Sequence, residues 1–266
     1  MKIKTLFIGV LLAVLFSGCG SEFWLANKFV VQSHRTRAAV YFPEEAQVTL
    51  IQNGDGTYTK VLDSLDQNAF LDIMYAAYAD EMRTFGVDVY IPEDADHVPV
   101  DSTHWLVLLS KVEIQGLFTD YVDHLFDFTD DYDYSFSLNT VNVAAWFDIN
   151  DGEWLPVTLY DECNLMDDFK SYVSNGNEGA QYHYDITPIT TNDVYDYAVY
   201  LGKRYATFTY NYMMNRYVGG ELKKKGDASR FKLRWDPYEE SLYFLLEGEG
   251  FIELGIENGD VLNDAN

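Results

Sequence analysis

The chain has 266 residues, of which 48% are hydrophobic and 16% aromatic. This composition supports a packed core and excludes an intrinsically disordered protein. Its 43 acidic residues outnumber its 18 basic ones, so the formal net charge is -25, which excludes a protein that binds nucleic acid by neutralising phosphates. Two cysteines are too few for a disulfide scaffold or a four-thiolate zinc site.

Residues 1–18 are typical of a signal peptide. Lys2 and Lys4 precede an unbroken apolar run from Leu6 to Phe16. As a helix this run would span roughly 16 Å, which is too short for the ~30 Å hydrocarbon core of a bilayer. We therefore expect a targeting segment that is removed on maturation, and not a membrane-spanning helix.

Residues 15–19 read Leu-Phe-Ser-Gly-Cys, which resembles the lipobox of bacterial lipoproteins, although Phe16 stands where leucine is most usual. The resemblance implies that Cys19 becomes the first residue and carries acyl chains, which would attach the protein to a membrane. Gly20 and Ser21 follow, without the aspartate that signals inner-membrane retention, so an outer-membrane lipoprotein of the cell envelope is expected. Which leaflet it faces stays open, and the alternative is an ordinary signal peptide that ends near a cysteine.

The mature chain is expected to form one domain. Residues 19–36 would be the lipidated cysteine and a tether, residues 37–256 the domain, and residues 257–266 a polar tail that frays. No Pro-rich or Ser-rich linker and no internal repeat divides the sequence.

The first part of the domain is predicted to contain strands and one helix. Strands are expected over 38–42, 48–51 and 57–62, the last two as a hairpin around Asn53-Gly54-Asp55-Gly56. A helix is expected to begin at the capping-box spacing of Ser64 and Gln67 and to end at Gly86. Apolar residues recur at helical spacing in between. They are Phe70, Ile73, Met74, Ala77, Met82 and Phe85.

A strand over 87–91 should follow, then a polar loop over 93–103 and a strand over 105–114 that is apolar enough to be central. In the second half, strands over 139–148 and 154–160 should form a hairpin. A long helix is expected over 192–218, with Thr191 as its N-cap and Gly219-Gly220 as its stop. Its apolar stripe should lie on a sheet. The stripe comprises Val194, Ala198, Leu201, Tyr205, Phe208 and Tyr212.

Residues 231–235 and 242–246 should form a last pair of strands around Asp236-Pro237. Together these elements predict an α+β fold, an antiparallel-rich mixed β-sheet with two main α-helices packed on it.

The segment 37–115 resembles a small α+β domain found in envelope proteins. A strand that ends at Pro43, a helix with a sheet-facing stripe and a Gly86-Val87 exit are similar to curli-secretion and lipopolysaccharide-assembly lipoproteins and to the N-terminal domain of the Tol-system periplasmic protein. Residues 101–115 and 201–217 look like uncharacterised envelope lipoproteins of Bacteroidota. The resemblance implies an assembly or transport accessory with an envelope protein partner, and it implies no catalytic residue.

Two clusters of titratable residues were considered as ion or acid–base sites. The acidic run Asp120, Asp123, Asp127, Asp130, Asp131 and Asp133 could supply the oxygens that Ca²⁺ needs, but it lacks the order and the glycine of a calcium loop. We interpret it as a solvated acidic loop, and whether it binds an ion stays open. The densest patch around a histidine joins His97 to Asp94, Asp96 and Asp101, with His104 just beyond; no two histidines have zinc-site spacing.

Signatures of catalysis and nucleotide binding are missing from the sequence, so a non-enzymatic protein without cofactor, metal or nucleotide is expected. Cys163 has no cationic residue nearby in sequence and is interpreted as core filler. An enzyme would need His97, His104 and a carboxylate to converge in one pocket. The run Lys223–Lys225 is the one basic cluster; we interpret it as a turn tip, with contact to anionic headgroups as the alternative.

The surplus of aromatic residues is the remaining functional signal. Tyrosine combines an apolar body with a polar tip, which suits interfaces, and Tyr132, Tyr134, Tyr182 and Tyr184 stand in polar surroundings. These four are the candidate binding residues, although tyrosines that merely fill strands would give the same pattern. We expect a lipid-anchored accessory or scaffold in outer-membrane assembly or transport; the alternative is a surface lipoprotein that binds a glycan or another ligand.

Overall fold

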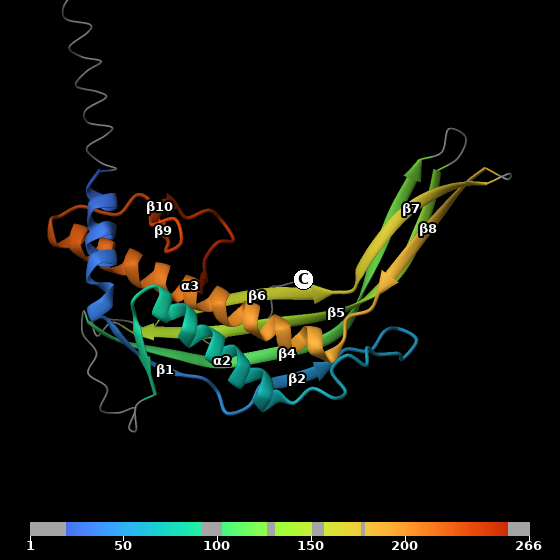
Figure 1. Ribbon diagram of the computed structural model, residues 1–266, viewed down its shortest axis with the longest axis horizontal. Coiled ribbons are helices and arrows are strands. Elements are labelled where there is room, and N and C mark those ends of the chain that lie inside the picture. The colour runs from blue at the N-terminus through green and yellow to red at the C-terminus, as the bar shows by residue number, and fades with distance from the viewer. Residues whose placement is uncertain (1–19, 92–102, 127–130, 151–156, 177–178, 255–266) are drawn as a thin grey trace, which may run out of the picture.

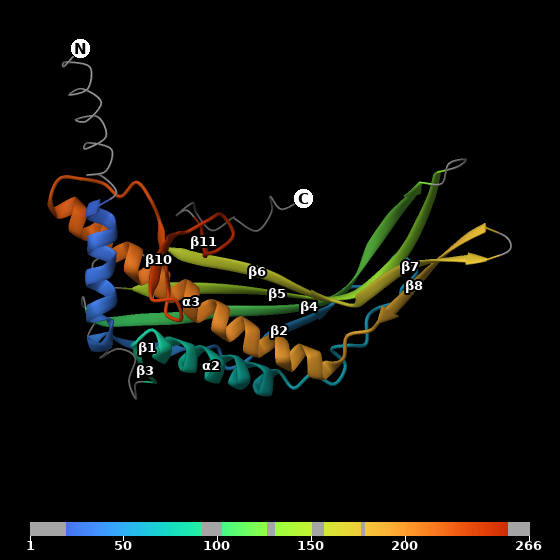
Figure 2. The ribbon, with the colours of Figure 1, turned by 45° about the horizontal axis from the view of Figure 1, so that its top comes forward.

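The structure is a computed structural model that describes residues 20–91, 103–126, 131–150, 157–176 and 179–254. It has an α+β fold in which helices cover one face of a mixed sheet (Figures 1 and 2). Cys19 and the polar tail lie outside the described residues, as does most of the loop expected over 93–103.

The main sheet has the order β11-β6-β5-β4-β1-β3, and β2 also pairs with β4. The parallel part contains β1 (Arg37–Tyr41), β2 (Gln47–Leu50) and β3 (Asp88–Tyr90). The antiparallel part contains β4 (His104–Phe126), β5 (Asp131–Asn150), β6 (Thr158–Met166) and β11 (Ile252–Leu254). The apolar strand expected over 105–114 is indeed central, since β4 has β1 and β2 along one edge and β5 along the other.

Three helices cover the sheet in the described part of the chain: one over residues 20–32, α2 (Gln67–Thr84) and α3 (Thr191–Lys224). A short 3-10 turn, η1 (Ser33–Arg35), follows the first. Two further hairpins, β7 (Asp168–Gly176) with β8 (Gly179–Thr187) and β9 (Leu233–Asp236) with β10 (Ser241–Phe244), complete the fold. A long arm, defined in the next subsection, projects from the molecule. We refer to the rest of the described structure as the body.

The predicted helical stripes do form the core. Phe70, Met74 and Met82 of α2 are fully buried, as are Val194, Leu201 and Tyr205 of α3. They pack against alternate residues of β4 and β5, so one face of the sheet is covered and the other meets solvent, as the alternation of buried positions shows.

The segment expected to be a tether is instead a helix over residues 20–32. Leu25 and Ala26 are fully buried and Phe29 is nearly so. The ring of Phe29 contacts those of Tyr210 and Tyr217 on α3 at centroid distances of 5.6 Å. These apolar residues recur at helical spacing, and the aromatic face of α3 gives them a place to pack, so they belong to the domain.

Of the hairpin expected around residues 53–56, the turn is confirmed and the second strand is not. The turn exists, since Gly56 adopts a φ of 83° and its N–H bonds to the Asn53 carbonyl at 2.9 Å. However, residues 57–62 form no strand, because β2 pairs with β4 instead. Thr59 and Leu62 pack over Gly116, where the absence of a Cβ leaves room for their side chains.

Gly86, at a φ of 80°, ends α2 as predicted, but the other three predicted helix termini are displaced by one to six residues. The N-cap of α2 is Asp66, whose carboxylate accepts from Asn68 and Ala69. The N-cap of α3 is Thr190. Gly219 and Gly220 do not end α3; Val218 and Leu222 are buried, and their packing outweighs the poor helix propensity of two glycines until Gly226, at a φ of 75°, ends the helix.

The expected acidic loop over 120–133 is also mostly strand. Asp120 lies in β4 opposite Ser137, and Asp131 and Asp133 lie in β5. In β5, Asp131 and Asp133 alternate in sequence with Tyr132 and Tyr134, which is the period-two pattern of a strand. Asp127 and Asp130 lie outside the described residues.

Close approach of α2 and α3 makes Gly202 irreplaceable in the fold. A Cβ on Gly202 would lie 2.3 Å from the Met74 carbonyl oxygen and 2.9 Å from the Ala77 Cβ. We expect Gly202→Ala to lower the free energy of unfolding by at least about 2 kcal/mol, because backbone atoms must move apart. Urea denaturation of wild type and variant measures this difference.

Gly219→Ala is the matched control, since nothing lies within 4 Å of its Cβ position. It should raise the free energy of unfolding by roughly 0.5–1 kcal/mol through helix propensity alone. A Gly202→Ala variant as stable as wild type would contradict this packing.

Candidate functional site

A long arm projects from the body at the end opposite residue 20 (Figures 1 and 2). The pairing of β2 with β4 ends at Gly116, and that of β6 with β5 ends at Thr140. Beyond these points β4 and β5 have only each other as ladder partners in the main sheet, over about ten residues or roughly 30 Å. We define the arm as residues 117–126 and 131–139 together with the β7–β8 hairpin.

The base of the arm is held by the buried carboxylate of Asp167, which separates β6 from β7. Its Oδ2 accepts from the backbone N–H and the side-chain amide of Asn139, both at 2.8 Å. Its Oδ1 accepts from the Ile189 N–H at 2.8 Å. Thr59 donates to the amide oxygen of Asn139 at 2.8 Å. Four segments of the chain are thereby joined where the arm leaves the body.

Above this base the two hairpins pack through aromatic rings. The rings of Tyr134 and Tyr184 stack with centroids 4.3 Å apart and planes 4° from parallel. Phe169 of β7 contacts Phe136 at 5.3 Å and Tyr121 at 4.9 Å. The contacts combine burial with favourable ring geometry, so the hairpins form one unit at their bases. Toward their tips the hairpins diverge (Figures 1 and 2).

One polar contact accompanies this ring cluster. The Tyr184 hydroxyl donates to Asp123 Oδ2 at 2.7 Å. Partial loss of water around the hydroxyl, together with the neighbouring carboxylate, raises the pKa of Tyr184 to about 12. Tyr184 therefore stays a neutral donor across the physiological range and cannot serve as a general base there.

The other face of the β7–β8 hairpin carries a second aromatic pair. Tyr172 stacks on His183 with centroids 4.9 Å apart, and the Ser174 hydroxyl lies 2.7 Å from His183 Nε2. Among the described residues, no carboxylate or cation is in hydrogen-bond contact with them. Their arrangement suits contact with a partner better than proton transfer.

The arm exposes several large apolar side chains on neighbouring strands. Tyr134 is 47% exposed and Tyr172 50%. Apolar surface grouped in this way is typical of sites that contact another molecule. The large apolar side chains of the arm that are classed as exposed are Tyr121, Val122, Tyr134, Tyr172, Val173, Tyr182 and Ile186.

The structure brings together two of the four predicted tyrosines, Tyr134 and Tyr184. Tyr182 lies two residues from Tyr184 on the same face of β8 and is 37% exposed. Tyr132 lies in β5 opposite Leu125, and its side chain is outside the described residues.

Sequence reasoning missed the other ring partners of this cluster, Tyr121, Phe136 and Phe169. The period-two alternation of aromatic with polar residues along 131–137 was the signal that could have found Phe136.

No model of a protein family matches the chain. Comparison with curated proteins likewise gives no significant match. The envelope-lipoprotein resemblance therefore rests on the sequence motifs alone. Within the described residues, no helix combines the length and apolarity that crossing a membrane requires.

The other predicted sites do not form a chemical centre in the part of the chain that the structure describes. There, no three His, Cys, Asp or Glu side chains are placed to hold a metal ion. His104 opens β4 with its Nδ1 3.1 Å from the Thr103 hydroxyl. His97, Asp94, Asp96 and Asp101 lie outside the described residues.

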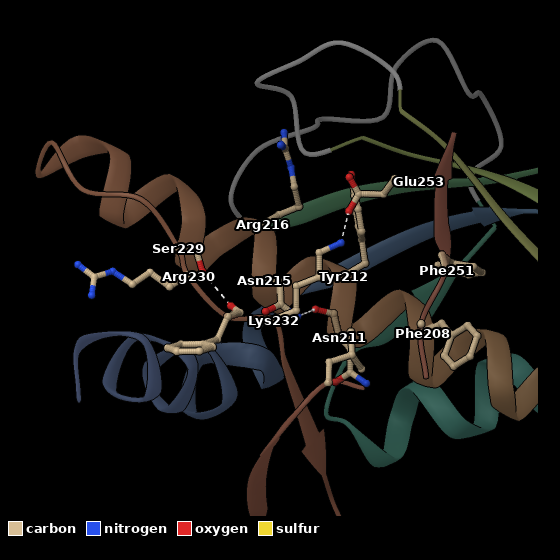
Figure 3. A pocket seen from close by; sticks show the side chains of 13 residues that line it. Phe208, Asn211, Tyr212, Asn215, Arg216, Ser229, Arg230, Lys232, Phe251 and Glu253 are labelled. Carbon is tan, nitrogen blue, oxygen red and sulfur yellow. Dashed lines mark hydrogen bonds and ion pairs between the residues drawn. The ribbon is translucent and has the colours of Figure 1, made fainter. Parts of the chain in front are cut away.

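A cavity of about 320 Å³ lies between α3 and the two segments that flank the β9–β10 hairpin, residues 229–232 and 245–253 (Figure 3). Two amide side chains hold β9 to the helix: Asn215 bonds to both the N–H and the carbonyl of Leu233, and the Asn211 oxygen accepts from the Trp235 N–H. The buried amide nitrogen of Asn211 has no hydrogen-bond partner within the described part of the chain. Lys232 pairs with Glu253 at 2.7 Å. The cavity is thus a seam between body elements, and the arm is the better candidate site.

Asp167→Asn should loosen the arm selectively, because the amide replaces one acceptor oxygen by a donor that faces other donors. We expect a loss of about 2–3 kcal/mol in the free energy of unfolding. We also expect faster hydrogen exchange in β7 and β8 than in the body. The exposed neighbour Asp168→Asn is the control and should change neither; equal effects of the two variants would refute the role of Asp167.

Cys163 should behave as an inert thiol. It donates to Asp161 Oδ2 at 3.5 Å, and burial together with this carboxylate raises its pKa to about 11. At pH 8 its thiolate fraction is then far below that of a free cysteine, and we expect iodoacetamide to react at least about tenfold more slowly than with the urea-unfolded chain. Similar rates in both states would contradict its interpretation as core filler.

Proposed function

We propose that this chain is a lipid-anchored protein of the cell envelope, attached to the outer membrane, that acts as a non-enzymatic accessory or scaffold. The observation that carries the proposal is the exposed aromatic arm at the end opposite residue 20. In this arrangement acyl chains on Cys19 hold one end at the membrane while the arm contacts an envelope protein. The lipobox-like sequence supports the anchor, and the apolar exposure of the arm supports the contact.

The charge of the arm indicates what kind of partner it suits. Residues 117–139 and 168–187 contain nine acidic residues and one lysine. Aromatic rings between carboxylates fit a partner surface that offers apolar side chains framed by Lys or Arg, since such complementarity speeds encounter and selects against acidic competitors. A partner in an assembly or transport system would carry this surface.

Photocrosslinking from matched tyrosine positions tests the proposal in intact cells. Tyr172 on the arm and Tyr200 on α3 are 50% and 51% exposed, so a benzophenone amino acid at either is equally accessible. We expect Tyr172 and Tyr182 to give one discrete adduct, and Tyr200 and Tyr238 to give none. The adduct should disappear with Cys19→Ala, which removes the acylation site.

Equal crosslinking from arm and body, or an adduct that persists without Cys19, would refute the proposal.

Glycan binding is the second candidate, favoured by the exposure of Tyr134 and Tyr182. It predicts instead no protein adduct, and binding on a glycan array that Tyr134→Ala or Tyr182→Ala abolishes. The stacking of Tyr134 on Tyr184 occupies one face of each ring, which leaves less surface for a sugar and makes the protein partner the better reading.

A further inference from the structure

Basic residues gather at the end of the molecule where the chain leads back to Cys19. Residues 216–234 contain seven Lys or Arg and two acidic residues, although acidic residues outnumber basic ones 43 to 18 in the whole chain. This segment covers the last turns of α3 and the chain that leads into β9. It lies beside the N-terminal helix (Figures 1 and 2).

Trp24, on the helix over residues 20–32, is exposed next to these basic residues. The Trp24 side chain is 59% exposed. The ammonium groups of Lys28 and Lys225 lie 5.9 and 5.6 Å from its ring centroid. Val31, seven residues on and therefore on the same helix face, is 66% exposed. The outer face of the helix thus presents apolar side chains next to cations.

Buried contacts fix the helix and the basic segment to one another. Glu22, almost fully buried, accepts from the Arg230 N–H at 2.5 Å and from the Ser229 hydroxyl at 3.1 Å. Phe29 packs on Tyr210 and Tyr217 of α3. The position of Trp24 beside the lysines is therefore set by the fold.

We propose that Trp24, Lys28, Lys223, Lys224 and Lys225, which we name the anchor-end patch, bind an anionic lipid surface. Tryptophan is favoured at the headgroup level of bilayers, and clustered lysines next to a membrane anchor are attracted to anionic lipids. The inference rests on the proposed function for its setting, because acyl chains on Cys19, directly before this helix, would bring the patch to the bilayer.

Charge then sets the orientation of the molecule. Residues 117–139 and 168–187, which contain the arm, carry nine acidic residues, and an anionic bilayer repels them once they come within a Debye length of about 10 Å. A protein lying flat on the membrane is thereby disfavoured. The bound protein stands on its anchor-end patch, and its arm is directed away from the bilayer.

Vesicle binding of residues 20–266, which contain the whole described core and lack Cys19, tests the patch without acyl chains. We expect binding to vesicles of phosphatidylethanolamine with phosphatidylglycerol, none to phosphatidylcholine, and a decrease as salt rises. The triple variant Lys223→Gln, Lys224→Gln, Lys225→Gln should lower the partition coefficient by about tenfold or more. The control Lys60→Gln, Lys170→Gln, Lys203→Gln removes the same charge elsewhere and should bind like wild type.

Brominated lipids provide a second readout, since they quench tryptophan fluorescence only at close range. Quenching should be lost in Trp24→Phe and kept in Trp146→Phe. No binding to anionic vesicles, equal binding to neutral ones, or equal behaviour of the two triple variants would overturn the inference. Its failure is distinguishable from that of the proposed function, because vesicle binding needs neither Cys19 nor an arm partner, whereas arm crosslinks need no phosphatidylglycerol.

Discussion

The arm depends on a single buried carboxylate. β4 and β5 run from body to arm without a break, but β6 and β7 are separated by one residue, Asp167. Both of its oxygens are used, by Asn139 on one side and Ile189 on the other. A buried charged acceptor with fully engaged oxygens is costly to rearrange. The angle at which the β7–β8 hairpin leaves the body is therefore fixed at this residue, and so is the contact between Tyr134 and Tyr184 above it.

Uneven charge gives the molecule two distinct ends. A net charge of -25 would by itself keep the protein away from an anionic membrane, but charges more than about 10 Å away are screened. The charge close to each surface therefore determines what that surface attracts. Lys28 and Lys225 lie beside Trp24 at one end, whereas aspartates and aromatic residues lie close together in the arm at the other end. The two ends therefore present chemically different surfaces, and under the proposed function each would contact a different class of partner.

Local sequence patterns predicted the helices and strands, whereas contacts between residues distant in sequence determine where these elements end and which side chains they bring together. The stripe from Val194 to Phe208 correctly gave the core face of α3, because helical spacing alone fixes which residues share a face. The predicted end of α3 at Gly219 and Gly220 was wrong. The helix continues because Leu222 is buried by tertiary contacts, which the local sequence does not show. Tyr134 and Tyr184 could be proposed as binding residues from composition, but their stacking joins positions fifty residues apart. Asp167 carried no local signal, because its importance lies in the three segments it joins.

The helix over residues 20–32 changes what an anchor on Cys19 would do. A flexible tether would let the domain reorient freely, whereas Glu22 bonds this helix to Arg230 and Phe29 packs it on α3. α3 has 34 residues, roughly 50 Å of helix, and extends from the base of the arm at Thr191 to the lysines at its other end (Figure 1). Its middle is locked to α2 at Gly202. One rigid helix therefore sets the distance between the two ends, so that a contact made by the arm occurs at a defined height above whatever surface the anchor-end patch occupies.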